Sequence, residues 1–439
     1  MVICDFCTNE KEFLWLSDGV YQHFVSFDYL CQYLRSLLID HHPMGFFNFT
    51  LGQGADILTA LGSYDFCDPV SLIAALVFPL TRLQRYTLMI FLKLWLVGLS
   101  FIVYCRASER ENLTAVLSGA IAYTFSGVVL YVVARHPNFI NWAYFFPLLL
   151  SGVELYDRRG RRLPLILFVF LNLLTSFYTF YINAVLTVLY VLVCSFCRLF
   201  LESPRSSWKR ELKKDLSIAA LFAVGILLSS FILLPTLHAY LNNPRVMENA
   251  GYAASVLYDY EYYRFLPEAL FEPYFVPGYH TVLGFSVLAF IPLTLLFTGK
   301  GHPRLKILLL VSFVMLCLPF VGRIMNGMSY ATNRWSYAFV FYGSFSLVEL
   351  YDEMKNLSRA EKFRLLIFAA AFSLIVLIRI NFRINPLFTG LFLIVTVLVF
   401  VLSRTFKKVE IGRVAVCLAL AGAVSGLFYL FGQSRQLCR

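Results

Sequence analysis

Charged residues are scarce in this sequence. Asp, Glu, Lys and Arg make up 14% of its 439 residues, whereas a soluble domain carries about 25%. Hydrophobic residues make up 59%, and the mean hydropathy is +0.71. Too little polar surface is available for a water-soluble globule, and the same numbers exclude a disordered chain, a collagen, a coiled coil and a small disulfide scaffold. The composition predicts an all-α polytopic integral membrane protein, because an open strand in lipid would leave its backbone groups unpaired.

Motifs for nucleotides and cofactors are also missing. The chain has no G-x-x-x-x-G-K-[ST], no G-x-G-x-x-G after a strand and no G-x-S-x-G. Its ten cysteines are scattered, and Cys4 and Cys7 form one C-x-x-C without the second pair or the histidine of a zinc site. We therefore expect no bound metal, no cofactor and no cytosolic nucleotide substrate.

Apolar runs that suit a membrane helix, which needs about 17–25 residues, occur about twelve times. Several of these runs are short, and the fourth and fifth are divided only near Tyr178. The predicted crossings are 86–105, 114–134, 138–155, 163–179, 181–199, 215–238, 279–298, 305–322, 335–351, 364–380, 387–402 and 412–432.

Basic residues between these runs predict the orientation of the helices. The loops on one side of the membrane, with the adjoining helix starts, hold 23 basic and 11 acidic residues, whereas the other side holds 13 basic and 14 acidic residues. The basic side should be cytoplasmic. The net charge of +11 then reflects membrane topology, and no nucleic-acid partner is expected.

Two of the predicted outer segments are long, and loops of such length are usually functional or disordered. Residues 1–85 form the first extracytoplasmic loop, with an amphipathic helix and a short re-entrant run. Residues 239–278 form a second outer loop that is rich in tyrosine. Six transmembrane helices are expected in 86–238 and six more in 279–432.

The first residues of the chain do not explain how the first loop would reach the outer side of the membrane. The topology places residue 1 outside, yet MVICDFCTNEKEFLW lacks the basic stretch and apolar run of a signal peptide. A segment that begins outside needs a helix to carry it across. We expect that a transmembrane helix belongs before the first loop and is missing from this sequence.

Residues suited to acid–base chemistry gather in the first outer loop. Asp18, Gln22 and His23 fall within six residues, and Asp28 follows. If a helix begins at Asp18, the amide and the imidazole lie about one turn further on, near the carboxylate. Such a carboxylate can act as a general base, but an aspartate at a helix start is also a common N-cap. The residues alone leave both interpretations of Asp18 open.

Two further clusters lie at a predicted outer helix end and in the second loop. Asn333 and Arg334 precede Trp335, where the arginine fork could pair with a phosphate, although interfacial arginines and tryptophans are also typical of membrane proteins. His238 and Arg245 come before a run of tyrosines, whose rings could lie on a sugar face or simply belong at an interface. These tyrosines are Tyr252, Tyr258, Tyr260, Tyr262 and Tyr263.

Two ionisable residues fall inside predicted crossings. Lys93 lies about two turns from the outer helix end at Tyr86, so its amine could snorkel to the interface. Glu154 stands four residues before Arg158, a spacing that favours an ion pair near the cytosolic rim. We expect both residues to serve structure.

Longer stretches of the sequence resemble the YfhO-type family of bacterial membrane proteins. The first outer loop carries the matching segments SDGVYQHFVSFDYLCQYLRSLL and NFTLGQGADILTALGSYDFCDPVSLIAALVFP. Further matches follow in order: AIAYTFSGVVLYV, PLLLSGVELYDRRGR, LTSFYTFYINAVLTVLY, LLPTLHAYLNNPR and NGMSYATNRWSYAF. The resemblance covers residues 17–350, and the ordered succession of the motifs carries it.

The resemblance implies a C-type glycosyltransferase fold, a multi-helix enzyme of the bacterial cytoplasmic membrane whose active site faces outward. Such proteins take a sugar from a polyprenyl phosphate and transfer it to a cell-envelope polymer, such as a teichoic acid, or to a lipid. In this fold an aspartate of the first outer loop acts as the base, and the matching position here is Asp18. Family members are usually longer, so the resemblance also implies a truncated or fragmentary gene product.

We therefore expect direct displacement at the anomeric carbon of a lipid-linked sugar, with Asp18 as the base. The leaving phosphate would be held by arginine, and Asp18, Arg245 and Arg334 should line one outward-facing cavity. The alternatives are a transporter of lipid or polysaccharide, which would place its ionisable groups near the bilayer midplane, and a non-catalytic scaffold. The residues expected to bind substrate are Gln22, His23, Asp28, His238, Arg245, Tyr260, Asn333 and Arg334.

Overall fold

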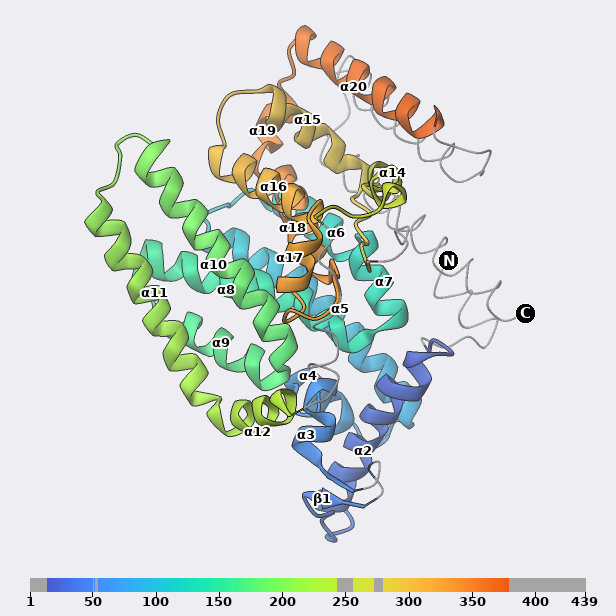
Figure 1. The fold of residues 1–439 in the computed structure, drawn as a ribbon. Helices are drawn as coiled ribbons and strands as arrows, with labels where there is room; N and C mark the ends of the chain where they lie inside the picture. Colours follow the sequence, from blue (N-terminus) through green and yellow to red (C-terminus); the bar gives the residue numbers. More distant parts are fainter. Residues whose placement is uncertain (1–13, 50, 52–53, 243–255, 272–278, 379–439) are drawn as a thin grey trace. The chain divides into compact units, whose positions relative to one another are not determined.

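The structure is a computed structural model, and nearly all of its regular structure is helical (Figure 1). The chain divides into two compact units by its internal contacts. Ile3–Ser108 and Val132–Tyr252 form the first unit, and Glu109–Tyr131 and Ala253–Arg439 form the second. The residues that the structure describes are 14–49, 51, 54–242, 256–271 and 279–378.

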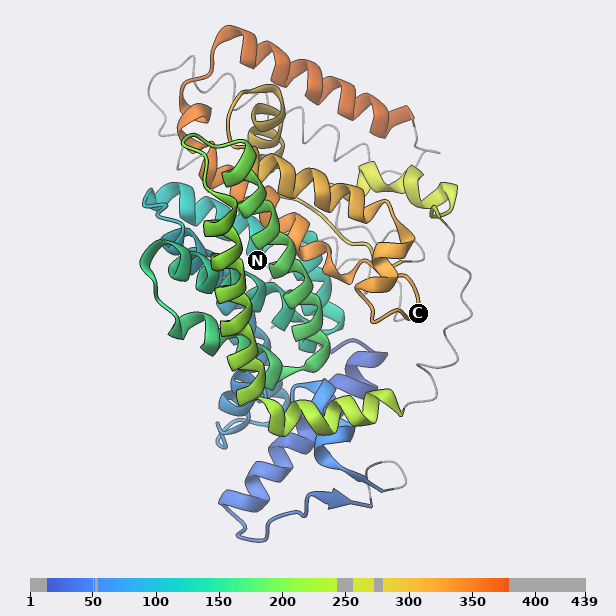
Figure 2. The same ribbon diagram turned by 60° about the vertical axis from the view of Figure 1, so that its left-hand side comes forward.

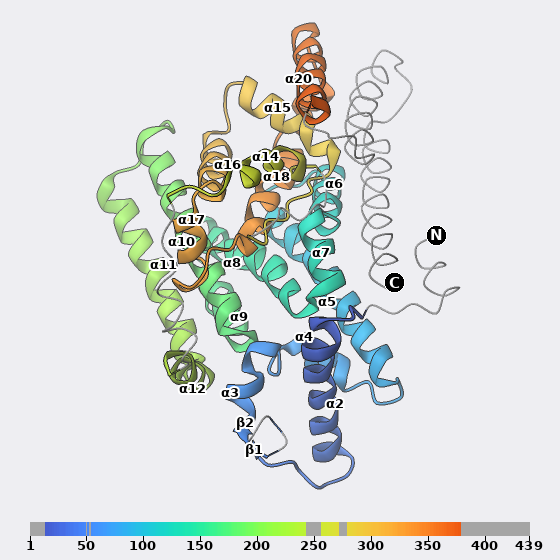
Figure 3. The same ribbon diagram turned by 45° about the vertical axis from the view of Figure 1, so that its right-hand side comes forward.

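The first unit begins with short elements in the predicted outer loop. A single π-helical turn, η1, runs directly into α2, whose buried face carries Phe27, Leu30 and Cys31. The ribbon of β1 and β2 is antiparallel, with Phe47 opposite Asp56, and it lies with α2 at one end of the unit (Figure 3). The bounds are η1 Gly19–Phe24, α2 Val25–Leu38, β1 Phe47–Asn48, β2 Ala55–Asp56, α3 Ile57–Leu61, η2 Gly62–Tyr64 and α4 Pro69–Ala75.

The longer helices of the first unit pack closely against one another. The helix α5 starts at a capping box between Thr81 and Gln84, and α8 packs along it. Helices α10 and α11 run side by side (Figure 2). A Cβ on Gly225 of α11 would lie 2.6 Å from Val169 of α9, so only glycine permits this approach. The bounds are α5 Arg82–Ala107, η3 Pro137–Phe139, α8 Ile140–Arg159, α9 Leu163–Thr175, α10 Phe177–Phe200, α11 Trp208–Leu228 and α12 Ser230–Leu241.

The second unit is built around α18, whose side chains are almost all buried. Helices α6 and α16 pack against it, and its Gly343 lies against the ring of Phe285, where a Cβ would not fit. Only the first part of α7 belongs to this unit. The bounds are α6 Leu113–Thr124, α7 Gly127–Arg135, α14 Tyr260–Ala269, η5 Val287–Ala289, α15 Phe290–Thr298, α16 Pro303–Leu316, α17 Pro319–Ile324, η6 Arg334–Ser336, α18 Tyr337–Glu349, α19 Tyr351–Lys355 and α20 Arg359–Ile378.

The described part of the chain contains two helices, α5 and α10, that are long and apolar enough to cross a membrane. The number rises to four if the bent pairs α6–α7, at 45°, and α11–α12, at 80°, each form one span. The predicted count of about twelve is not confirmed. Helices such as α9 and α15 are shorter than the ~20 residues that a bilayer requires, and the predicted crossings 387–402 and 412–432 lie outside the described residues.

Candidate functional site

Asp18 lies at the start of η1, but it does not cap the helix. Its backbone is already helical, with φ −56° and ψ −27°, and its side chain makes no capping hydrogen bond. Its Oδ1 instead accepts a hydrogen bond of 2.8 Å from Nε2 of Gln22. The N-cap interpretation of Asp18 is therefore wrong, because a single π-helical turn brings the amide of Gln22 under the carboxylate.

The hydrogen-bonded chain that begins at Asp18 continues to a third residue. The hydroxyl of Tyr64 donates to Oε1 of Gln22 over 3.1 Å. Both ends of the Gln22 amide are thus occupied, which fixes its orientation toward Asp18. The carboxylate is half-buried, and its Oδ2 accepts no hydrogen bond from the described residues. One carboxylate oxygen is held in place, and the other is free to take a proton.

A pair of histidines lies beside this chain. Nε2 of His23 is 3.1 Å from Nδ1 of His136, and the His136 ring stacks on Phe139. Burial and, after it, the neighbouring His136 lower the pKa of His23 to about 3. The His23 imidazole is therefore neutral at physiological pH. Its Nδ1 is buried and has no hydrogen-bond partner within the described residues.

A second polar cluster in the same unit joins two carboxylates to one ammonium. Nζ of Lys93 lies 2.5 Å from Oδ2 of Asp65 and 3.2 Å from Oδ2 of Asp68. The side chains are 0%, 3% and 0% exposed, respectively. The sequence suggested that the Lys93 amine could snorkel to the interface, but the structure shows that it does not. It stays inside because two carboxylates reach it from the loop before α4, and we call Asp65, Asp68 and Lys93 the ionic triad.

Further contacts fix the position of the triad. Oδ1 of Asp68 accepts from the hydroxyls of Tyr144, at 3.2 Å, and Thr175, at 3.4 Å. Its Oδ2 accepts from the backbone N–H of Ser71 and so caps α4. Burial raises the pKa of the Asp65 carboxyl to about 7, although the Lys93 ammonium opposes the rise. A proton on Asp65 leaves the triad neutral, with Asp68 as the counter-ion of Lys93.

In the second unit, Asn333 belongs to a closed network of polar groups. Its side chain is completely buried, and its amide nitrogen donates to Oγ1 of Thr281, at 2.9 Å, and to the hydroxyl of Tyr262, at 3.0 Å. Its amide oxygen accepts from the hydroxyl of Tyr258 over 3.4 Å. The Tyr262 hydroxyl in turn donates to the carbonyl of Leu316. Every polar atom of the Asn333 side chain has a protein partner.

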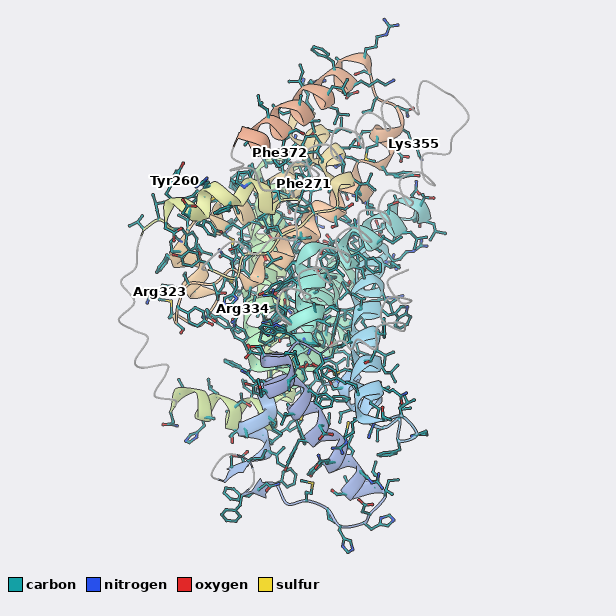
Figure 4. All side chains as sticks on the ribbon, turned by 90° about the vertical axis from the view of Figure 1, so that its right-hand side faces the viewer. Tyr260, Phe271, Arg323, Arg334, Lys355 and Phe372 are labelled. Carbon is teal, nitrogen blue, oxygen red and sulfur yellow. The ribbon has the colours of Figure 1, made fainter. Side chains whose placement is uncertain are left out.

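Arg334 follows Asn333 but lies nearer the surface. Its Nη2 donates to the hydroxyl of Tyr330 over 3.1 Å, and the guanidinium lies over the same ring. His280 is an electrostatic neighbour of this guanidinium. Figure 4 marks Arg334 together with Tyr260, which starts α14 with its side chain 76% exposed.

The other predicted site residues are distributed differently. Asp28 is bound by Arg82, whose Nη1 contacts both carboxylate oxygens at 2.9 and 3.1 Å, and by Gln32. His238 is exposed on α12. Arg245 lies outside the described residues, and Asp18 and Arg334 belong to different units. The convergence of Asp18, Arg245 and Arg334 on one cavity stays a prediction.

The expected ion pair of Glu154 can be assessed directly. Glu154 pairs with Arg158 at 2.6 Å, as its spacing predicted, and it also accepts from the hydroxyl of Tyr190. No group of three or more His, Cys, Asp or Glu side chains in the described ranges has a geometry that could hold a metal ion. The pair Cys4 and Cys7 lies outside those ranges.

The sequence analysis missed several residues of the first unit, namely Tyr64, Asp65, Asp68 and His136. One signal for the triad was present, since a lysine within a membrane helix requires a counter-ion. The Asp65-x-x-Asp68 pair is the nearest outer acidic sequence to Lys93. No comparable signal linked His136 to His23, because the two residues lie 113 positions apart.

Comparison with known proteins gives one match along nearly the whole chain. The family described as "Bacterial membrane protein YfhO" matches residues 1–436. A protein of Bacillus subtilis (strain 168), named "Uncharacterized protein YfhO", is 26% identical over 350 residues. That alignment covers 74% of this chain and 38% of the relative, so the chain spans less than two-fifths of the curated relative it matches.

Two crystal structures superpose on the chain with a TM-score of 0.48 each. One is ArnT from Cupriavidus metallidurans in the apo state, with 15% identity, covering 83% of this chain and 65% of that chain. The other is the same protein bound to undecaprenyl phosphate, with 14% identity, covering 83% of this chain and 66% of that chain.

Proposed function

The chain belongs to the bacterial membrane protein family YfhO, and on this premise we propose that it is a membrane glycosyltransferase. It moves a sugar from a polyprenyl phosphate to a cell-envelope polymer or lipid on the outer face of the cytoplasmic membrane. One observation carries the proposal. Asp18 does not cap its helix, and it has one oxygen held by Gln22 and the other without a hydrogen bond from the described residues.

The proposed reaction is a direct displacement with inversion. Asp18 takes the proton from an acceptor hydroxyl as its oxygen attacks the anomeric carbon of the donor sugar. The bond between that carbon and the phosphate oxygen breaks, and the polyprenyl phosphate leaves with the bonding electrons. A positioned general base accelerates such a step by about 10²–10⁴-fold. Gln22 orients the base, because Tyr64 fixes the amide from the other side.

The remaining predicted residues are assigned to substrate binding within this proposal. Arg334, with Arg245 or His238, holds the charge of the leaving phosphate. Tyr260 contacts the sugar, and the buried Asn333 acts only indirectly, by holding the tyrosines of its network, since its own amide is occupied. The neutral His23, whose buried Nδ1 has no hydrogen-bond partner among the described residues, is assigned to the acceptor side of the site. Asp28 helps to hold the first loop in place through Arg82.

The proposal is tested with purified protein in liposomes, a radiolabelled polyprenyl-phosphate sugar and an extract of envelope polymer as acceptor. The unmutated chain should transfer label, and Asp18→Asn should lose transfer while it still binds the donor. Asp40→Asn, on an exposed aspartate that pairs loosely with Arg35 at 3.7 Å, is the matched control and should retain activity. Full turnover by Asp18→Asn would remove Asp18 from the role of base.

The orientation of the site is tested separately in intact cells. Single cysteines at Tyr21 and Tyr260, whose side chains are 77% and 76% exposed, should react with an impermeant thiol reagent in a cysteine-free background. A cysteine at Lys300, in a loop predicted to be cytoplasmic, should react only after lysis. The opposite pattern would place the proposed site on the wrong side of the membrane for a lipid-linked donor.

A lipid or polysaccharide transporter is the second candidate, and the ionic triad favours it. A buried lysine and two carboxylates in a membrane protein can mark a transport pathway, and Lys93 lies about three turns into α5, at 3.6 residues per turn. A transporter would move the lipid-linked sugar across vesicles without cleaving it. Translocation of intact donor, with no release of polyprenyl phosphate, would favour this candidate over the transferase.

A further inference from the structure

The ionic triad has no part in the proposed displacement, yet it is one of the most completely buried polar clusters in the first unit. Lys93 lies in α5, whereas Asp65 and Asp68 lie in the loop between η2 and α4. Burying three ionisable groups is costly and is tolerated only where their mutual geometry is held. Tyr64, the last residue of η2, immediately precedes the loop that carries the two aspartates.

The backbone of this loop needs such support. Asp65 adopts a left-handed conformation, with φ +61° and ψ +26°, which is uncommon for a residue other than glycine. The N–H of Asp68 donates to the carbonyl of Asp65 over 3.1 Å and closes the turn. Lys93 contacts the side chains at both ends of the turn. The ammonium therefore ties the strained turn to the side of α5, and strained residues persist only when their surroundings fix them.

The residue immediately before the strained turn is Tyr64, and its two polar ends are both engaged. Its carbonyl accepts from Oγ of Ser26 over 3.3 Å, which joins the loop to α2. Its hydroxyl donates to Gln22, whose amide donates to Asp18. An uninterrupted path of contacts thus runs from Lys93 through the turn and Tyr64 to the proposed base.

We infer that Lys93, acting through Asp65 and Asp68, is a positioning residue for Asp18: it fixes the turn that directs the Tyr64 hydroxyl onto Gln22. The inference rests on the proposed function, because it assigns the triad to the same reaction. Lys93 touches neither donor nor acceptor in this scheme. Its loss should therefore lower kcat and leave the KM for the lipid-linked donor unchanged.

The first test removes only the hydroxyl at the end of the path. Tyr64→Phe keeps the ring and should lower kcat about tenfold, the equivalent of one hydrogen bond worth about 1.4 kcal/mol. The KM for the donor should not change. Because one exposed hydroxyl is removed, folding should not be at risk, and an unchanged kcat would overturn the inference directly.

The second test breaks the triad and leaves Asp65 as a neutral acid, because burial raises the pKa of Asp65 and the Lys93 ammonium that opposes the rise is removed. Lys93→Gln combined with Asp68→Asn removes one cation and one anion, and asparagine caps a helix about as well as aspartate. This double variant should lower kcat to the same extent as Tyr64→Phe. Adding Tyr64→Phe to it should bring no further loss, because both changes interrupt one path. Losses that multiply would show that the triad affects turnover by a route that does not pass through Tyr64, and would overturn the inference.

A matched control uses a different ion pair of the same unit. Arg198 pairs with Glu211 at 2.7 Å, with side chains 15% and 4% exposed. Arg198→Gln with Glu211→Gln should lower the unfolding temperature but leave kcat within twofold. The two proposals fail differently. Normal kcat in Tyr64→Phe, in the double variant and in their combination overturns the positioning role and leaves the transferase intact. Absence of turnover in the unmutated chain overturns the transferase.

Discussion

Asp18 in the first unit and Asn333 in the second are both centres of polar networks, but the two networks end differently. The chain from Tyr64 through Gln22 stops at Asp18, where one carboxylate oxygen accepts no hydrogen bond from the described residues. The Asn333 amide is surrounded by Tyr258, Tyr262 and Thr281 and leaves no polar atom unsatisfied. An open network can accept a proton from a substrate, whereas a closed one holds its own residues in place.

Burial separates the two networks in the same way. Asp18 is half-buried and Gln22 is exposed, so a substrate can reach the end of the chain. Asn333 is completely buried, and burial raises the pKa of both Tyr258 and Tyr262. Their hydroxyls therefore stay protonated and donate at any physiological pH. The Asn333 network should therefore mainly stabilise the fold, whereas activity should be sensitive to changes in the Asp18 network.

The largest effect should fall on the open network. Asp18→Asn should lower kcat by about 10²–10⁴-fold, which corresponds to about 3–5 kcal/mol of transition-state stabilisation. The unfolding temperature should stay the same, because the asparagine oxygen can still accept from Gln22. Transfer assays and thermal unfolding on the same preparation measure both. A variant that loses stability together with activity would make Asp18 a structural residue and erase the contrast with Asn333.

The next largest effect should fall on the closed network and should affect stability first. Asn333→Leu keeps the volume but leaves the Tyr258 hydroxyl without its acceptor, and each buried group left unsatisfied costs about 1–3 kcal/mol. Denaturant unfolding should show this loss. Asn356→Leu, on an exposed asparagine, is the control and should stay within about 0.5 kcal/mol. Lost transfer with unchanged stability would place Asn333 among the binding residues.

The ionic triad predicts a pH dependence of stability. Burial raises the pKa of Asp65 from its ordinary value of 3.8 to about 7, with Asp68 adding to the rise and Lys93 and the Asn141 amide opposing it. The folded chain thus binds more protons than the unfolded chain between these values. The corresponding stability is present below about pH 4 and is lost as pH rises through 7.

This dependence is checked by unfolding the protein at a series of pH values from 5 to 8. Stability should decline across the series in the unmutated chain, and Asp65→Asn should make the decline shallower, because the amide mimics the protonated acid. Asp56→Asn, which keeps the N-cap of α3, should leave the slope unchanged. An equal slope in Asp65→Asn would show that another group titrates.

The sequence predicted local features of this molecule better than distant ones. The helical character followed from apolar runs, and the Asp18–Gln22 and Glu154–Arg158 contacts followed from helical spacing. The YfhO family was identified from ordered motifs and is confirmed by the match over residues 1–436. Each of these inferences depends on residues close together in the chain or on a linear order.

The unpredicted features depend on contacts across the chain. Lys93 reaches Asp65 over 28 positions, and His23 reaches His136 over 113. Periodicity contains no information about such pairs. The failure of the N-cap interpretation of Asp18 has a different origin, because the residue begins a π-helical turn whose start carries no sequence signature. Such turns are rare and occur often at functional sites.

The smallest effect should fall on Asp28, the second acidic residue of the first loop and a useful contrast to Asp18. Both its oxygens are occupied, by Arg82 and by Gln32, and Arg82 is 58% exposed.

Arg82→Gln should therefore cost about 0.2–1 kcal/mol of stability at low ionic strength, as the loss of an exposed ion pair does. The difference in stability from the unmutated chain should fall toward zero in ~1 M salt, where the screening length is only about 3 Å. Transfer should stay within twofold, because neither Arg82 nor Asp28 belongs to the hydrogen-bonded chain of Asp18, Gln22 and Tyr64. A loss of more than tenfold would mean that Asp28 reaches the substrate, and the distinction between open and closed networks would then fail within a single loop.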